Sequence, residues 1–303
     1  MYQYTIIQWI FFFYLYCFLG WCFESTYVSL KSRHFVNRGF MRGPFLPLYG
    51  SGAIMMLVVS MPFQKNLILV YVAGCIGATI LEYVTGVVME ALFKVRYWDY
   101  SQNKFNFQGH ICLGSSLAWG LLTILMTRVI HKPIETIVLS IPIAALTVIV
   151  YVMTAYIGAD FALSFKAALD LRDVLVRMER AKEELLHVHK RLEAMAENMN
   201  AIHLRREEFA DNLSTHMEDL KAGIEDRLER LRIMSQTDHS NYSDKFQEEL
   251  QELRAKYVKS MEERKRLGSV RDFFQRDLIR SHPTMSSKRF REALEELKKN
   301  TKK

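Results

Sequence analysis

Carboxylates inside apolar runs are the residues of this chain with the clearest chemical potential. Glu24 and Glu82 each follow a small residue by one helical turn, Gly20 in the first case and Ala78 in the second, and Glu90 comes two turns after Glu82. A carboxylate in apolar surroundings needs a partner or a water-filled cavity, and such residues commonly mark ion, substrate or proton pathways. We therefore expect these acids to face the interior of a helix bundle.

Two loops supply basic, aromatic and amide side chains that could meet these acids. The first follows the run that contains Glu24 and includes "FVNRGFMRGPFLPLYGSG", and the second contains "VRYWDYS". We expect Arg42 or Arg38 to supply counter-charge to the buried acids. The predicted polar cluster consists of Glu24, Asn37, Arg38, Arg42, Glu82, Glu90, Arg96, Trp98, Asp99 and Tyr100.

Several chemistries fit such a cluster. It could be a set of buried salt bridges that holds two helical hairpins together, or a site for a substrate, an ion or a lipid headgroup. Asp99 with the two acids of the third apolar run could bind a cation or relay protons, or Asp99 could simply pair with Arg96 while Trp98 and Tyr100 anchor at the headgroup level. An intramembrane enzyme with a carboxylate base is a further alternative. We assign no catalytic residue.

The elements that position these residues are apolar segments of about 20 residues, the length that a helix needs to cross a membrane. Five segments qualify within a predicted membrane domain of residues 1–162: about 5–27, 45–63, 67–93, 111–130 and 134–157. The loops after the first and third carry seven Lys and Arg, whereas the other side carries three, Lys65, Arg128 and Lys132. This bias predicts a plasma-membrane protein with its N-terminus outside and its tail in the cytoplasm.

The first four segments also suggest a parallel repeat of two helical hairpins. The loops end in Arg42-Gly43 and Gln108-Gly109, and the return segments begin with "PFLPLYGSG" and "HICLGSSLAWG". Parallel duplications of this kind occur in transporters. Chance similarity between two glycine-rich and aromatic-rich hairpins is the alternative.

The polar tail shows a heptad of apolar residues from Leu171 to Ile202. It predicts a long coiled-coil helix over residues 163–236, followed by C-terminal helical segments over 243–303. We expect the seam to join copies of the chain in a homo-oligomer, although an antiparallel return of the tail would also cover it. The predicted fold class is therefore an all-α, polytopic membrane protein with a long cytoplasmic coiled-coil tail.

Composition narrows the partners. The 303 residues include 40 Lys and Arg against 33 Asp and Glu, and the formal charge of +7 suits contact with anionic membrane lipids. Acids and bases are interspersed in the tail, which argues against nucleic acid as a partner. The four cysteines lie in apolar runs without a CxxC spacing, so we predict buried thiols, no metal site and no cofactor.

The motifs "NRGFMRGPFLPLYGSG", "LEYVTGVVMEALFKVRYWDYS" and "FNFQGHICLGSSLAWG" resemble those of bacterial membrane proteins known as ABC-transporter type IV, or CmpB-like, permeases. The tail segment "HPTMSSKRFREALEELKK" also resembles the ending of that family. The resemblance implies a permease-like transport component of unknown substrate. Because the chain contains no GxxxxGK[ST] phosphate-binding loop, any ATPase would be a separate subunit. A membrane-anchored scaffold or sensor, and an enzyme acting on lipid headgroups, are the alternatives.

Overall fold

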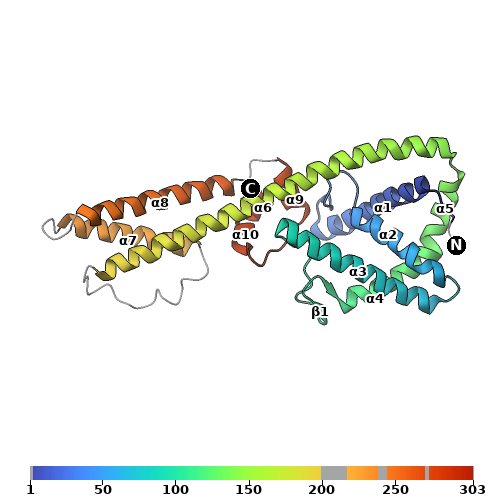
Figure 1. The fold of residues 1–303 in the computed structure, drawn as a ribbon, viewed down its shortest axis with the longest axis horizontal. Helices are drawn as coiled ribbons and strands as arrows, with labels where there is room; N and C mark the ends of the chain where they lie inside the picture. Colours follow the sequence, from blue (N-terminus) through green and yellow to red (C-terminus); the bar gives the residue numbers. More distant parts are fainter. Residues whose placement is uncertain (1–2, 199–216, 238–243, 270–272, 303) are drawn as a thin grey trace. The chain divides into compact units, whose positions relative to one another are not determined.

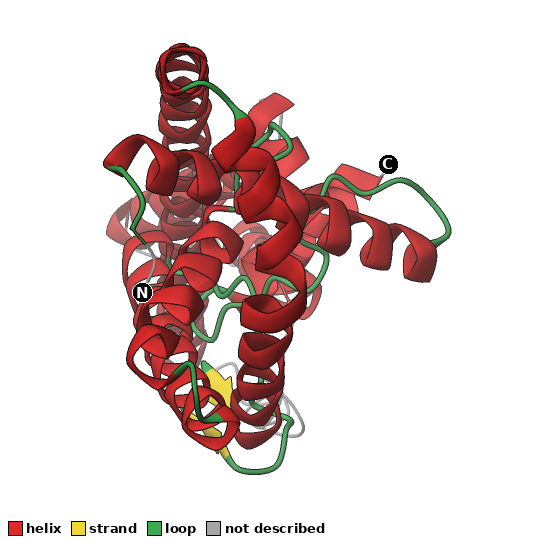
Figure 2. Ribbon diagram, turned by 90° about the vertical axis from the view of Figure 1, so that its right-hand side faces the viewer, coloured by secondary structure: helices red, strands yellow, loops and turns green. Residues whose placement is uncertain are grey.

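The computed structural model describes residues 3–198, 217–237, 244–269 and 273–302, and most of these residues are helical (Figures 1 and 2). The chain divides into two compact units. Unit 1 contains Met1–Arg172 together with Arg271–Arg289, and unit 2 contains Asp173–Val270 with Phe290–Thr301. The candidate site lies entirely in unit 1.

Unit 1 is built around two pairs of helices. In the first pair α1 (Ile6–Ser32) packs on α2 (Pro47–Ser60), and in the second pair α3 (Leu67–Phe93) packs on α4 (Leu113–Leu125). The outgoing helices α1 and α3 are both 27 residues long and end at a basic residue with left-handed backbone, Arg33 (φ 56°) and Lys94 (φ 61°). This shared ending supports the predicted repeat.

Four helical stretches of the described chain are long and apolar enough to cross a membrane: Ile6–Lys31, Leu67–Phe93, Leu113–Ser140 and Ile143–Met195. The predicted second span is shorter, because α2 has 14 residues and the 3-10 turn that extends it, Met61–Phe63, adds 3. At a rise of about 1.5 Å per residue this helix reaches about 26 Å, somewhat less than a hydrocarbon core of about 30 Å.

The boundary between the predicted fourth and fifth spans was misplaced. The predicted spans, about 111–130 and 134–157, imply a break near residues 131–133, but α4 continues through a π turn, Met126–Ile130, into α5 (His131–Ser140). The amide of His131 bonds to the carbonyl of Met126, five residues back, and this wider turn lies just before Pro133, which has no amide to donate. The break falls instead at Ile141, whose extended backbone is typical of a residue before proline.

The loop between α3 and α4 contains a small hairpin that the sequence did not predict. Strand β1 (Asn106–Phe107) pairs in antiparallel fashion with β2 (Ile111–Cys112). Gln108 and Gly109 form its turn, with φ of 54° and 76°. A Cβ on Gly109 would lie 2.5 Å from the Arg96 guanidinium, so this glycine lets the hairpin close against a charged side chain.

Part of the tail returns to unit 1. Helix α9 (Phe273–Ser281) and the irregular residues after it lie against both loops. Arg96 and Ser286 exchange two backbone hydrogen bonds, of 2.7 and 3.0 Å. We call residues 273–289 the docked segment. Because it contacts residues of the loops after α1 and after α3, both loops lie at one end of unit 1, which we call the loop end.

Unit 2 is a helical assembly of its own. It comprises the second part of α6 (Ile143–Asn198), α7 (Met217–Thr237), α8 (Asp244–Gly268) and α10 (Arg291–Lys302). Heptad residues such as Leu185 and Leu192 are fully buried, and α7 and α8 of the same chain cover them. The predicted continuous helix to residue 236 includes residues 199–216, which lie outside the described part. The homo-oligomer stays a prediction.

Candidate functional site

The carboxylate of Glu82 is buried in unit 1 among neutral hydrogen-bond donors. Its side chain is on the face of α3 that also buries Gly74, Ala78 and Gly86. The Tyr100 hydroxyl donates to it at 3.0 Å, the Trp119 indole N–H at 2.9 Å, and the Ser115 hydroxyl lies 3.2 Å away. Within the described residues, no Lys or Arg forms an ion pair with Glu82.

Glu24 of the first hairpin extends the same polar region. The Tyr49 hydroxyl is hydrogen-bonded to the Glu24 carboxylate, and the Arg38 guanidinium interacts electrostatically with both. Tyr100 interacts electrostatically with Glu24 as well as with Glu82. Tyr100 thus links the two acids at corresponding places of the two hairpins, since it donates to Glu82 and interacts electrostatically with Glu24. We call this group the Glu82 cluster: Glu24, Arg38, Tyr49, Glu82, Tyr100, Ser115 and Trp119.

A glycine makes room for one of these contacts. A Cβ on Gly20 would lie 2.3 Å from the Cβ of Tyr49, so α1 and α2 can approach closely only because position 20 carries no side chain. This close approach brings the Tyr49 hydroxyl to Glu24, one turn along α1.

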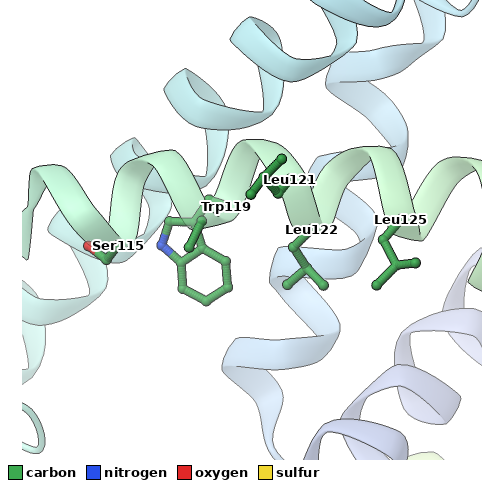
Figure 3. A pocket seen from close by; sticks show the side chains of 6 residues that line it. Ser115, Trp119, Leu121, Leu122 and Leu125 are labelled. Atoms are coloured by element: carbon green, nitrogen blue, oxygen red, sulfur yellow. The ribbon is translucent and has the colours of Figure 1, made fainter.

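An apolar recess adjoins the Glu82 cluster. It has a volume of about 560 Å³, is open, and is lined by Ser115, Ala118, Trp119, Leu121, Leu122 and Leu125, all from α4 (Figure 3). Ser115 and Trp119 belong to both the recess and the cluster. A buried carboxylate and a large apolar surface are thus separated by only two side chains.

A second group, the Arg96 cluster, is an ion-pair network. Arg96 is 5% exposed and lies 2.8 Å from Glu90 and 3.5 Å from Asp99. The His110 ring nitrogen Nε2 lies 3.1 Å from Glu90, and the Trp98 indole donates to the His110 carbonyl. In this cluster each acid has a basic partner, so its geometry is that of a network that holds the second loop on α3.

Two groups of the loop have shifted pKa values. Burial disfavours the charged form of Asp99, but hydrogen bonds from Ser101 and Ser286 and the charge of Arg96 outweigh it, so the pKa of Asp99 is lowered. Burial and the charge of Arg96 lower the pKa of His110 more than Glu90 raises it. Asp99 is therefore ionised and His110 neutral at pH 7.

Arg42 lies with the docked segment rather than with the buried acids. Its guanidinium stands 4.0 Å from the centre of the Phe274 ring and 5.0 Å from that of Phe273, and its Nε lies 4.0 Å from Asp277. The expectation that Arg42 could supply counter-charge to the acids of α1 and α3 is thus corrected. Its guanidinium is instead held by the two phenylalanine rings and by Asp277. Arg38 takes that place beside Glu24.

Other contacts fix the docked segment and the first loop. Arg38 donates to the Ser281 carbonyl at 3.0 Å, and the Ser286 hydroxyl donates to Asp99. Asn37 accepts from the Trp21 indole and donates to the Arg42 carbonyl, both at 2.6 Å. The side chain of Asn37 is thus used within the loop.

The ten predicted residues fall into three places. Glu24, Arg38, Glu82 and Tyr100 meet in the Glu82 cluster, Glu90, Arg96, Trp98 and Asp99 lie in or beside the Arg96 cluster, and Asn37 and Arg42 hold the first loop and the docked segment. Sequence reasoning missed Tyr49, Ser115 and Trp119. The sequence pattern does contain them, since hydrogen-bond donors occupy the first two turns of both α2 and α4. In α4 the donors Ser115 and Trp119 are four residues apart and therefore lie on one face.

The fold and the site define a helical membrane protein with a polar cluster buried between two hairpins. The chain belongs to the family described as "Putative ABC-transporter type IV", which matches residues 11–165. The match includes every member of the Glu82 cluster. No curated protein and no solved structure matches the chain. The family and the apolar helices fit a component of membrane transport.

Proposed function

We propose that the protein is a permease-like transport component whose substrate site is the Glu82 cluster. One observation carries the proposal: a carboxylate buried beside apolar surface is held by three neutral donors and has no basic partner within the described residues. Such a group has a net demand for positive charge. The substrate class is therefore a cation, a proton or a ligand with a protonated nitrogen.

The chain crosses the membrane five times in this proposal. The four long apolar helices supply four crossings, and α2 with its 3-10 turn supplies a shorter one, since local thinning or tilting accommodates a few ångströms of mismatch. The loop end, rich in Lys and Arg, faces the cytoplasm together with the tail, and the N-terminus lies outside. Lys65 is on the outer side with Arg128 and Lys132 of the long helix that includes α5, since Arg128 donates to the carbonyl of Gln64, the residue before Lys65.

If ATP drives the transport, a separate subunit binds it, because the sequence has no phosphate-binding loop of the Walker type. The docked segment contacts both loops next to the Glu82 cluster and so offers such a subunit a place to act on them. Arg38 supports this idea, since it contacts Ser281 and interacts with Glu24.

Native mass spectrometry of the full chain, purified in mild detergent, tests the assignment of the site. The wild type is expected to retain a small cationic ligand, or to gain one on titration with Na⁺, K⁺ or a polyamine. Glu82→Gln should lose it, whereas the matched variant Glu90→Gln should keep it, because Glu90 is already paired with Arg96. Equal binding by the wild type and Glu82→Gln would contradict a cation site at Glu82.

A membrane-anchored scaffold or sensor is the second candidate, and the docked segment is the observation that favours it. In that case the contact of Arg42 with Asp277 and the two phenylalanine rings would carry the activity. Arg42→Ala would then abolish function in cells while Glu82→Gln would act only through stability. The transport proposal expects the opposite order of effects.

A further inference from the structure

A second polar site lies in unit 1 where α2 ends and the π turn begins. A cavity of about 150 Å³ is lined by Ser60, Gln64, Val70, Thr127, Arg128, His131, Lys132 and Glu135. None of these residues was singled out as a site residue from the sequence. The cavity is smaller than the pockets of about 300 to 1,000 Å³ that hold drug-sized ligands, yet several times the roughly 30 Å³ of one water molecule.

The hydrogen bonds around His131 show which charged group of this cavity already has a partner inside the protein. His131 is 1% exposed, and its two ring nitrogens contact the Tyr16 hydroxyl at 2.6 Å and the Tyr4 hydroxyl at 3.0 Å. Tyr4 donates its proton to Glu135, so it accepts from Nε2 of His131. In the neutral ring, Nδ1 then accepts from Tyr16. The Glu135 carboxylate is thus engaged by Tyr4.

The two cationic side chains of the cavity, Arg128 and Lys132, have no charged partner among the described residues. Arg128 donates to the backbone carbonyl of Gln64, and neither Arg128 nor Lys132 forms an ion pair within the described part of the chain. They lie four residues apart, on either side of the junction between the π turn and α5, and therefore project toward one side of the helix. Two cations against one engaged carboxylate leave the cavity with net positive charge.

We infer that this cavity binds the phosphate group of an anionic ligand, with Arg128 and Lys132 as its charged contacts. Guanidinium and ammonium groups form charge-assisted hydrogen bonds with phosphate and are common phosphate-binding side chains in proteins. The cavity admits a phosphate group and not a whole lipid. The phosphate therefore belongs either to an anionic lipid headgroup or to a free phosphate compound. The inference does not depend on the function proposed for the Glu82 cluster.

The test uses the full chain in detergent with two probes, inorganic phosphate and phosphatidylglycerol, and with phosphatidylcholine as the reference lipid. Binding is followed by the number of retained lipids in native mass spectra and by the phosphate dependence of the unfolding temperature. The double variant Arg128→Gln/Lys132→Gln should weaken binding at least about tenfold, as expected for two charge-assisted hydrogen bonds. Glu135→Gln should strengthen binding, because it removes the one negative charge of the cavity.

The control variant Lys31→Gln/Lys104→Gln removes two exposed charges at the loop end. It distinguishes specific binding in the cavity from nonspecific electrostatic attraction of anions to the protein. It should leave binding of the probe unchanged. Retention of phosphatidylglycerol alone would identify a lipid headgroup as the ligand, and a response to inorganic phosphate alone would identify a free phosphate compound. No preference for either probe over the reference, or an equal loss in the control variant, would overturn the inference.

Discussion

Glu82 and Glu90 lie two turns apart on the same helix, yet their partners differ in kind. Glu82 is bound by a phenol, a hydroxyl and an indole, whereas Glu90 is bound by Arg96 and His110. An ion pair satisfies a buried carboxylate without a ligand, but neutral donors leave its charge uncompensated. At the scale of single residues, this difference distinguishes a candidate binding group from a structural one.

Trp119→Phe tests the importance of the donors to Glu82. The substitution keeps an aromatic ring and removes the N–H that donates at 2.9 Å. We expect the free energy of unfolding in mild detergent, followed by circular dichroism, to fall by about 1 to 3 kcal/mol. Trp9→Phe is the matched control, because the Trp9 ring packs against Tyr4, Phe12 and the apolar core, and within the described residues its indole N–H makes no hydrogen bond. Equal effects of the two substitutions would show that the indole N–H contributes nothing specific.

At the scale of helices, close packing of small residues brings the polar groups together. A Cβ at Gly20 would lie 2.3 Å from Tyr49, one at Gly74 would lie 2.2 Å from Thr123, and one at Gly120 would lie 2.4 Å from Cys75. Both hairpins therefore use glycine where their two helices meet. The clusters at the loop end depend on this spacing, since Tyr49 and Ser115 reach the acids across the same interfaces.

Gly20→Ala should separate α1 from α2 and weaken the Tyr49–Glu24 contact. The added methyl group overlaps Tyr49, and overpacking of this kind costs about 1 to 3 kcal/mol. Gly52→Ala is the control on α2, because nothing lies within 4 Å of a Cβ built there, and it should be neutral or slightly stabilising. Thermal unfolding of both variants in the same detergent gives the comparison. A Gly20→Ala protein as stable as Gly52→Ala would contradict the packing described for this hairpin.

The docked segment should loosen as the pH falls. Burial and the charge of Arg38 lower the pKa of His282 to about 3, while an exposed histidine titrates near about 6.5. Between these values the undocked segment binds a proton that the docked segment excludes, so docking is fully favourable above pH 6.5 and is lost progressively toward pH 3. Tyr97, against whose ring His282 packs, stays neutral because burial raises its pKa.

Hydrogen exchange of residues 273–289 at pH 7.5 and pH 5.0, corrected for intrinsic rates, measures this effect. Exchange in α8 is the internal reference. The wild type should lose protection at the lower pH, and the non-titrating variant His282→Gln should show the same protection at both values. A wild type without pH dependence would mean that His282 does not control docking.

The sequence predicts some of these elements and not others, for physical reasons. Helices α1 and α3 follow from long apolar runs that end in charged residues. The break near Pro133 was wrong because a π turn can accommodate a proline, and nothing in local composition signals that turn. The docked segment could not be predicted, because Ser286 lies 190 residues beyond Arg96 and no periodicity links the two. Of the candidate site, the acids and Tyr100 were predicted from the sequence. Tyr49, Ser115 and Trp119 were missed, because their places in the first two turns of α2 and α4 do not show which acid they reach.

At the scale of the whole molecule, two units are joined by the helix α6. Unit 1 holds both candidate sites, whereas unit 2 buries its apolar seam among α6, α7 and α8. Polar contacts inside unit 2 complete it: Arg264, which is 4% exposed, donates to the Met178 carbonyl and pairs with Glu296 at 2.7 Å. Each unit has its own core, so a destabilising substitution in one core should first lower the stability of that unit.

Leu192→Ala tests how the seam is covered. This side chain is fully buried, and its removal should cost unit 2 about 2 to 5 kcal/mol. Hydrogen exchange should increase in α7 and α8 while α1 and α3 keep their protection. Native mass spectrometry of the same samples reports the predicted homo-oligomer. If the substitution instead dissociated an oligomer and left exchange in α7 and α8 unchanged, the seam would be covered by a second chain.

The measurement that most directly tests the central claim is cation flux through the reconstituted full chain. Proteoliposomes with an internal pH dye, or with labelled Na⁺ or K⁺, are exposed to an imposed membrane potential, and wild type is compared with Glu82→Gln and Glu90→Gln. Transport at the Glu82 cluster predicts a flux for wild type and Glu90→Gln that falls to the level of empty liposomes for Glu82→Gln. A flux that survives Glu82→Gln, or that is lost only in Glu90→Gln, would contradict the assignment of Glu82 as the substrate-binding carboxylate.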